Sequence, residues 1–200
     1  MIVKKILLGK LLLIVAVALS VWLSYIPDQP YHQPTAETAQ QNFHVIEFND
    51  EGKMHLPEQW QALQARITQT YQGPAPELLI FVHGWHHSAQ PQDENFVAFQ
   101  HFYQQMSKRD PQRNLLGLYI GWRGDKFDPL FLDGSTDATS TLEPLDFPTI
   151  FQRKRVAKKV GQTGLSQLLD QLDQLVEQRK MQRYVLVGHS LGGAMALHAS

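Results

Sequence analysis

Short apolar runs alternate with amphipathic segments through most of the chain. The runs Phe43–Phe48, Leu78–Val82, Leu115–Ile120 and Arg183–Val187 predict four β-strands. The second and third contain almost no polar residue, which is typical of strands buried on both faces of a parallel sheet. Strands that alternate with helices predict an α/β fold, with a mostly parallel sheet, right-handed crossovers and flanking helices.

Start signals and apolar residues at helical spacing indicate the helices. Pro57 suits the first turn of one helix, and the Asp93 carboxylate can cap another. A long helix is expected over residues 151–178, where Gly161 and Gly164 lower helix propensity and so predict close packing against the sheet. The apolar positions that mark these helices are Trp60, Leu63, Ile67 and Tyr71; Phe96, Phe99, Tyr103 and Met106; Val156, Val160, Leu168, Leu172 and Leu175.

Residues 121–148 show no hydrophobic period. Turn-forming residues are interspersed there with aromatic and aliphatic ones such as Phe127 and Leu142. A loop of this length is uncommon in a compact domain. It is interpreted as a lid-like insertion that forms a lid or an acyl-binding wall, with a loosely packed surface excursion as the alternative.

The N-terminal segment has the order of an export signal. Lys4, Lys5 and Lys10 precede an uncharged run over residues 11–26. As a helix, residues 6–26 would span about 31 Å, enough for the hydrocarbon core of a membrane. Residues 1–26 are therefore expected to be a signal anchor or a signal peptide, and the chain is expected to reach a membrane through them.

The flanks of this segment favour a retained anchor over a cleaved peptide. Trp22 and Tyr25 suit a membrane interface, whereas Ala18 and Ser20 could form a cleavage site. The lysines would stay in the cytoplasm, so the catalytic part would lie outside it, membrane-anchored or, alternatively, secreted after cleavage. The Pro/Gln-rich residues 27–42 are interpreted as a linker, and residues 43–200 as the globular core.

Composition narrows the chemistry. The 200 residues are 43% hydrophobic and carry a formal charge of −1, which argues against nucleic acid as a partner. The absence of cysteine excludes disulfides and thiol nucleophiles, so covalent catalysis would use serine. No cofactor is expected. A basic cluster on the long helix is interpreted as a solvated helix face; it comprises Arg153, Lys154, Arg155, Lys158 and Lys159.

The strongest motif is Gly188-x-Ser190-x-Gly192, which follows a β-prone run and precedes a helical segment. In this pattern a strand enters a tight turn, glycines make room, and the serine projects from the bend as a nucleophile. Its hydroxyl needs a general base, and the oxyanion needs hydrogen-bond donors. The backbone N–H of Leu191, at a helix N-terminus, is one candidate donor.

The second oxyanion donor is expected after the strand Leu78–Val82. There the sequence reads His83-Gly84-Trp85, and the N–H of Trp85 is the candidate, with a simple strand-ending turn as the alternative. His86 and His87 follow, but the three histidines lack metal-ligand spacing, so a polar loop rim is expected and no metal. Arg123-Gly124-Asp125 is expected at the same rim.

These motifs, in this order, resemble the first half of an α/β-hydrolase over about residues 43–200. The resemblance to the esterase and lipase superfamily implies a carboxylesterase-like or lipase-like serine hydrolase, with a small-molecule or lipid ester as substrate. In that family the acid and the histidine follow the nucleophile, and only ten residues follow Ser190. The chain is therefore interpreted as the N-terminal portion of a longer enzyme or as a truncated product without a full triad.

The order of the motifs leads to two further expectations. Strand Arg183–Val187 would lie at an uncovered edge of the sheet. The alternative to a hydrolase is a non-catalytic, membrane-tethered α/β binding module that keeps the turn around Ser190 as scaffold. An acid at a strand end and a loop histidine downstream of Ser200 would favour the enzyme.

Overall fold

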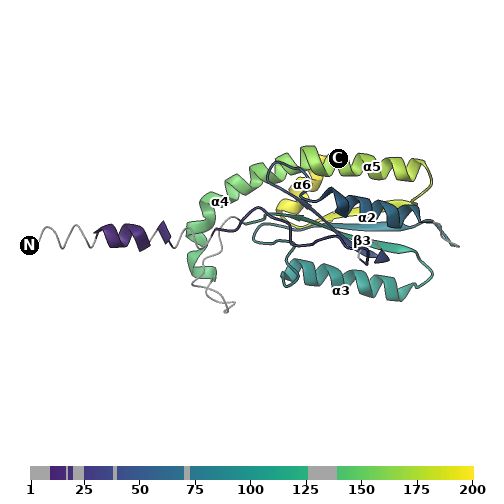
Figure 1. The fold of residues 1–200 in the computed structure, drawn as a ribbon, viewed down its shortest axis with the longest axis horizontal. Coiled ribbons are helices and arrows are strands. Elements are labelled where there is room, and N and C mark those ends of the chain that lie inside the picture. Colours follow the sequence, from purple (N-terminus) through teal and green to yellow (C-terminus); the bar gives the residue numbers. More distant parts are fainter. Residues whose placement is uncertain (1–9, 17, 20–24, 38–39, 70–72, 126–138) are drawn as a thin grey trace, which may run out of the picture.

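All four predicted strands are present in a single parallel sheet. The computed structural model describes residues 10–16, 18–19, 25–37, 40–69, 73–125 and 139–200, without the side chains of residues 139–149. The strand order is β1-β3-β2-β4, and each neighbouring pair is parallel (Figure 1). The predicted α/β fold with flanking helices is confirmed. The strands are β1 (Phe43–Phe48), β2 (Glu77–Val82), β3 (Leu115–Trp122) and β4 (Arg183–Gly188).

Helices cover both faces of the sheet. One face is covered by α3, whereas α2, α5 and α6 lie on the other (Figure 1). The predicted cap of α3 is confirmed, because the Asp93 carboxylate accepts hydrogen bonds from the N–H groups of Asn95 and Phe96. The helices are α2 (Pro57–Thr68), α3 (Glu94–Arg109), α4 (Thr139–Val160), the π-helical turn η2 (Gly161–Leu165), α5 (Ser166–Glu177) and α6 (Leu191–Ala199).

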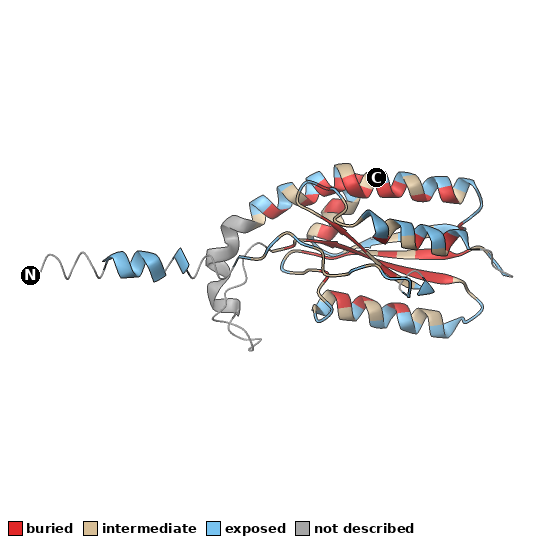
Figure 2. Ribbon diagram, in the orientation of Figure 1, coloured by how far each residue is buried: buried red, intermediate tan, exposed pale blue. Residues whose placement is uncertain are grey.

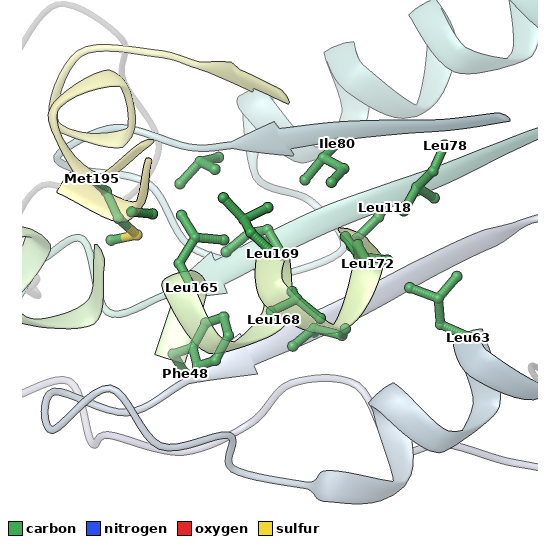
Figure 3. Packing of buried hydrophobic residues seen from close by; sticks show 14 of the residues in the cluster. Phe48, Leu63, Leu78, Ile80, Leu118, Leu165, Leu168, Leu169, Leu172 and Met195 are labelled. Atoms are coloured by element: carbon green, nitrogen blue, oxygen red, sulfur yellow. The ribbon is translucent and has the colours of Figure 1, made fainter. Parts of the chain in front are cut away.

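The larger core lies between the sheet and the α2/α5/α6 layer. Figure 3 shows Leu168 and Leu172 of α5 packed toward Ile80 and Leu118 of the central strands, and each of these side chains is fully buried. Figure 2 shows the same pattern along the whole sheet, with buried residues concentrated on the inner strands and the inner faces of the helices. The predicted parallel-sheet core therefore supports the loops at the carboxyl ends of the strands.

The long helix begins earlier than the sequence predicts. It starts at Thr139 rather than near residue 151, so part of the aperiodic insertion is helical; residues 126–138 of that insertion lie outside the described residues. The long helix also contains the π-helical turn η2. Its two glycines allow close packing, as expected, but only Gly164 packs against the sheet, whereas Gly161 packs against α6. A Cβ on Gly164 would lie 2.6 Å from the ring of Phe48 in β1, whereas one on Gly161 would lie 2.5 Å from the carbonyl oxygen of Met195 in α6.

β4 is an edge strand, as the sequence predicts. It pairs only with β2 within the described residues, and its Val185 and Val187 side chains are 48% and 44% exposed. Tyr184 and Leu186 alternate with them and pack against the larger core. One apolar face of this strand is thus exposed, while the other is held by the α5/α6 layer.

Residues 10–16 and 18–19 of the N-terminal segment are helical, and their side chains are exposed. No helix among the described residues is both long enough and apolar enough to cross a membrane. The sequence-based span over residues 6–26 includes residues 6–9, 17 and 20–24, which lie outside the described residues. The anchor accordingly stays a prediction.

Residues 25–34, here named the N-terminal strap, are docked onto the domain. The N–H groups of Tyr31 and His32 donate to the two carboxylate oxygens of Glu47, at 2.8 and 2.9 Å. The Gln59 amide of α2 donates to the carbonyl oxygen of His32 and to the Glu47 carboxylate, at 2.7 and 2.9 Å. Because Glu47 is 3% exposed, these bonds satisfy a buried carboxylate and fix the path of the strap.

Candidate active site

Ser190 occupies a backbone conformation that residues with a side chain rarely adopt. It lies between the end of β4 and the start of α6, with φ 53° and ψ −118°. A non-glycine residue in this region costs of order 1–3 kcal/mol, which the surrounding structure must offset. The strand, the sharp bend and the helix are the arrangement that the sequence motif predicts, and they make the serine project from the turn.

The two motif glycines make this bend sterically possible. A Cβ on Gly188 would lie 2.5 Å from the carbonyl oxygen of Gly192 and 2.5 Å from the N–H nitrogen of Gly193. A Cβ on Gly192 would collide with the backbone carbonyl of Val82, the last residue of β2. Glycine is therefore required at both positions, because α6 starts directly against the ends of β4 and β2.

The loop after β2 reaches the serine. A Cβ on Gly84 would lie 3.1 Å from the Ser190 Cβ and 2.9 Å from Nδ1 of His189. The backbone N–H of His189 donates to the carbonyl oxygen of Val82 at 3.0 Å, which ties the two loops together. The structure thus brings His83-Gly84-Trp85 and Ser190 to one place, as the order of the motifs predicts.

The orientation of the Trp85 N–H can be read from the peptide that precedes it. A Cβ on Gly124, which follows β3, would lie 2.7 Å from the carbonyl oxygen of Gly84, so this oxygen points toward β3. In a trans peptide the N–H points the opposite way. The Trp85 N–H, on the opposite side of this peptide, therefore points away from Gly124.

Both candidate oxyanion donors are available. In the described part of the chain, neither the Trp85 N–H nor the Leu191 N–H donates a hydrogen bond. Leu191 is the first residue of α6, so its N–H has no acceptor within the helix and carries part of the positive end of the helix dipole. The arrangement can stabilise a negative oxygen placed above Ser190.

His83 holds the Gly84 peptide in place, a role that the sequence does not reveal. Its ring is fully buried and lies in parallel stacks with Tyr119 and Trp122. Its Nδ1 donates to the carbonyl oxygen of Gly84 at 2.9 Å, and its Nε2 accepts from the N–H of Trp122 at 3.1 Å. Burial lowers the pKa of His83 to about 4, so the ring is neutral, as this bonding requires.

The three histidines of this loop have separate partners. The expectation of a polar rim is wrong for His83, because the strand end carries that ring inward between two aromatic residues. His86 is exposed and donates to the Asp125 carboxylate at 2.5 Å. His87 donates to Asp93 at 3.3 Å. Within the described residues, no group of three or more potential ligands could hold a metal ion.

The segment that follows β3 lies at the site, as the sequence predicts. A Cβ on Gly124 would collide with the backbone of His87 as well as approach the carbonyl oxygen of Gly84. Together with the bond between Asp125 and His86, this contact packs the Arg123-Gly124-Asp125 segment against the loop after β2. The rim thus combines the ends of β2, β3 and β4.

Behind this rim is a buried ion cluster, which corrects one sequence interpretation. Arg153 of α4 is fully buried rather than solvated, because its guanidinium donates to both Asp50 oxygens at 2.8 and 2.9 Å and to the carbonyl oxygen of Arg123 at 2.8 Å. Arg123 also pairs with Asp50. Burial opposes ionisation of Asp50, but the two arginines outweigh it and lower its pKa. Helical spacing places Arg153 on the same stripe as Val156 and Val160, and this spacing was the sequence signal for its burial.

The other members of the basic cluster remain at the surface. Lys154, Arg155, Lys158 and Lys159 are exposed, as the solvated-face interpretation requires. Lys159 pairs with Glu51 in the turn after β1. Only the member on the buried stripe of α4 is therefore removed from solvent.

The base for Ser190 is not identified. Within the described residues the Ser190 hydroxyl makes no hydrogen bond, and the histidine–carboxylate pairs are His86–Asp125, His87–Asp93 and His55–Asp28. His198 lies on the far side of α6, where its Cβ faces Gly161. Within the described part of the chain, the site thus has a candidate nucleophile and candidate oxyanion donors, and no base contacts the serine.

Comparison with known proteins finds a family similarity for one stretch of the chain. Residues 120–200 match the family model described as lipase (class 3), a range that includes β4, Ser190 and α6 but not His83-Gly84-Trp85. No curated protein and no solved structure matches the chain. Over residues 120–200, this chain is therefore similar to the class 3 lipases, a lipase family of the α/β-hydrolase superfamily.

Proposed function

We propose that this protein is a serine hydrolase that acts on an ester, with Ser190 as its nucleophile. The conformation of Ser190 carries the proposal: a serine held at φ 53° between a strand and a helix, with the loop of Gly84 directly against it. At the family level, the class 3 lipase match supports a lipase-like hydrolase. A small-molecule or lipid ester is the substrate class that fits both observations.

The reaction is an acyl transfer in two steps. The Ser190 Oγ attacks the ester carbonyl carbon while a base takes the hydroxyl proton, and the carbonyl oxygen becomes an oxyanion. The N–H groups of Trp85 and Leu191 donate to that oxyanion. Its collapse expels the alcohol, which takes up the proton, and leaves an acyl ester on Ser190. Water then attacks this ester and releases the acid.

Binding without catalysis is the second candidate, and one observation favours it. The Ser190 hydroxyl has no hydrogen-bond partner within the described residues, whereas an activated serine needs a base within reach. In this alternative the protein is a membrane-tethered α/β binding module, and the turn around Ser190 serves as scaffold. Because no base contacts Ser190 within the described residues, we expect little or no ester turnover from these 200 residues.

An active-site probe separates the two functions. A fluorophosphonate should label Ser190 in the full-length protein, and the Ser190→Ala variant should stay unlabelled. Absence of labelling, while a control hydrolase is labelled, would support the binding module. Ester hydrolysis by the 200-residue chain that Ser190→Ala abolishes would show the expectation of little turnover to be wrong.

The location proposed for the protein rests on its sequence. The lysines before the uncharged residues 11–26 support an anchored protein with its catalytic part outside the cytoplasm, and a secreted protein is the alternative. Cell fractionation followed by protease treatment of intact cells tests this assignment. An anchored protein should stay with the membranes and be digested from outside.

A further inference from the structure

The N-terminal strap begins at the same edge of the domain as Ser190. All strands are parallel, so their carboxyl ends, and the loops that hold Gly84, Gly124 and Ser190, lie along one edge of the sheet. Arg123, directly after β3, donates to the Tyr25 hydroxyl at 3.1 Å and to the carbonyl oxygen of Ile26 at 3.0 Å. This edge is here named the carboxyl edge.

The contact between the strap and Arg123 is held from several sides. The Arg123 guanidinium lies over the Tyr25 ring, 5.6 Å from its centroid, in a cation–π arrangement. Arg123 is itself fixed by Asp50, which also accepts from Arg153, and the Asp50 N–H donates to Asp28 of the strap at 2.9 Å. Such a partly buried, charge-assisted network resists rotation of the strap about the domain.

The chain that precedes the strap is apolar and exposed. The side chains of Leu11, Leu12, Leu13, Ile14 and Val15 are each more than half exposed, and Leu19 is 51% exposed. Figures 1 and 2 show residues 10–16 projecting away from the domain on the side where α4 extends past the sheet. An uncharged run of this length, preceded by lysines, fits a lipid bilayer as the partner that covers it.

The same side of the domain carries groups that suit a lipid surface. Lys154, Arg155 and Lys158 of α4 are exposed, and the Phe151 ring one turn before them is 59% exposed. Basic side chains attract anionic headgroups, and an aromatic ring can enter the interface between headgroups and acyl chains. These residues lie on a helix whose Arg153 is bonded to the ion cluster behind the rim of the site.

From these observations we propose that the strap fixes the domain with its carboxyl edge against the bilayer that holds the N-terminal segment. The inference rests on the membrane anchor and the hydrolase given under Proposed function. The mouth of the Ser190 site then faces the lipid, so an ester can enter from the membrane that anchors the protein. The amino ends of the strands face away from it.

The geometry of the domain and the lack of cysteine allow a direct test. Glu51→Cys introduces one thiol in the turn after β1, at the carboxyl edge, and Gln112→Cys introduces one before β3, at the opposite edge. Both positions are exposed. The eight residues of β3 separate the two edges by roughly 26 Å. Each variant is labelled with a donor fluorophore, and energy transfer to an acceptor lipid is measured in vesicles that contain anionic phospholipid.

Stronger transfer from position 51 than from position 112 is the expected result. Arg123→Met should abolish this difference, because it removes the contacts to Tyr25 and Ile26. The matched control Arg113→Met removes an arginine that pairs with Glu77 at the other edge, and it should keep the difference. Tyr25→Ala, which leaves the pairing of Arg123 with Asp50 intact, should reduce the difference and replaces Arg123→Met if that variant does not fold.

Each failure has its own meaning. Equal transfer from the two positions in vesicle-bound protein would overturn the orientation. Failure of the full chain to float with vesicles would overturn the anchor and, with it, this inference. Absence of fluorophosphonate labelling at Ser190 would overturn the hydrolase, while the orientation measured by energy transfer would stand.

Discussion

Gly84 lies so close to Ser190 that there is no room for a methyl group between them: a Cβ on Gly84 would be 3.1 Å from the Ser190 Cβ. This approach places the loop after β2, which carries Trp85, beside Ser190. The proposed reaction depends on this contact, because the loop after β2 carries Trp85 and the end of β4 leads to Ser190.

Substitution of Gly84 should therefore impair the reaction at Ser190. Gly84→Ala pushes the loop away from His189 and Ser190, and loss of an oxyanion donor typically lowers the rate by about 10²-fold or more. The measurement is the rate of fluorophosphonate labelling in the full-length protein. Gly73→Ala is the matched control, because a Cβ there meets no atom of the described residues within 4 Å. Equal labelling rates for the two variants would contradict the proposed contact.

Relief of the backbone strain at Ser190 should raise the free energy of unfolding. Ser190→Gly relieves the cost of the φ 53° conformation and should raise the free energy of unfolding by about 1 kcal/mol. Ser190→Ala retains a Cβ and hence most of the strain, so it should give little or no gain. Denaturant unfolding of the three proteins measures this effect. A glycine variant no more stable than the alanine variant would argue against a strained turn.

His83 should stabilise the fold and position the loop at once. His83→Phe keeps an aromatic ring between Tyr119 and Trp122 but leaves the Trp122 N–H and the Gly84 carbonyl without partners. A buried group left unsatisfied costs about 1–3 kcal/mol. We expect a lower free energy of unfolding and slower labelling of Ser190. The control His101→Phe, at an exposed position of α3, should change neither.

The neutral state of His83 predicts a pH dependence. The folded-state pKa is about 4 and the ordinary value is 6.5, so the unfolded chain binds more protons between these two values. Stability should therefore fall as the pH is lowered from 6.5 toward 4, by about 3 kcal/mol for this group. His44, whose pKa burial also lowers to about 4, adds to the same slope. Unfolding measured across this range should show a smaller slope for His83→Phe than for the unmodified chain.

The buried ion cluster should be sensitive to the loss of one partner. Arg153→Met leaves the charge of Asp50 with Arg123 alone in a largely buried setting, and breaking such a pair typically costs about 3–5 kcal/mol. The neighbouring Lys154→Met changes an exposed residue and should stay within roughly 0.5 kcal/mol. Thermal or denaturant unfolding measures the stability of both variants. Similar losses of stability for both would contradict a structural role of the cluster.

Periodicity and turn chemistry predicted most of the fold. The four strands, the Asp93 cap and the exposed edge of β4 all follow from local patterns, because apolar runs and capping groups act over a few residues. The start of α4 could not be predicted in this way. Pro144 and Pro148 lie within the helical residues 139–160 and lack the backbone N–H that a helix interior uses, so the local pattern favours a loop there.

Contacts between residues far apart in the sequence could not be predicted either. The burial of Arg153 depends on Asp50, which is far away in the sequence, and the role of His83 depends on Trp122 at the end of another strand. The strap shows the same limit: its proline-rich sequence indicates a linker, but the carboxylate of Glu47 and the guanidinium of Arg123 hold it against the domain. No local pattern contains these pairings.

The most direct test of the central claim is the site of covalent modification in the full-length protein. After reaction with a fluorophosphonate, peptide mass mapping should place the adduct on the peptide that contains Ser190, and denaturation before the reaction should abolish it. An unmodified Ser190 peptide, beside a labelled control hydrolase, would contradict the assignment of Ser190 as the nucleophile.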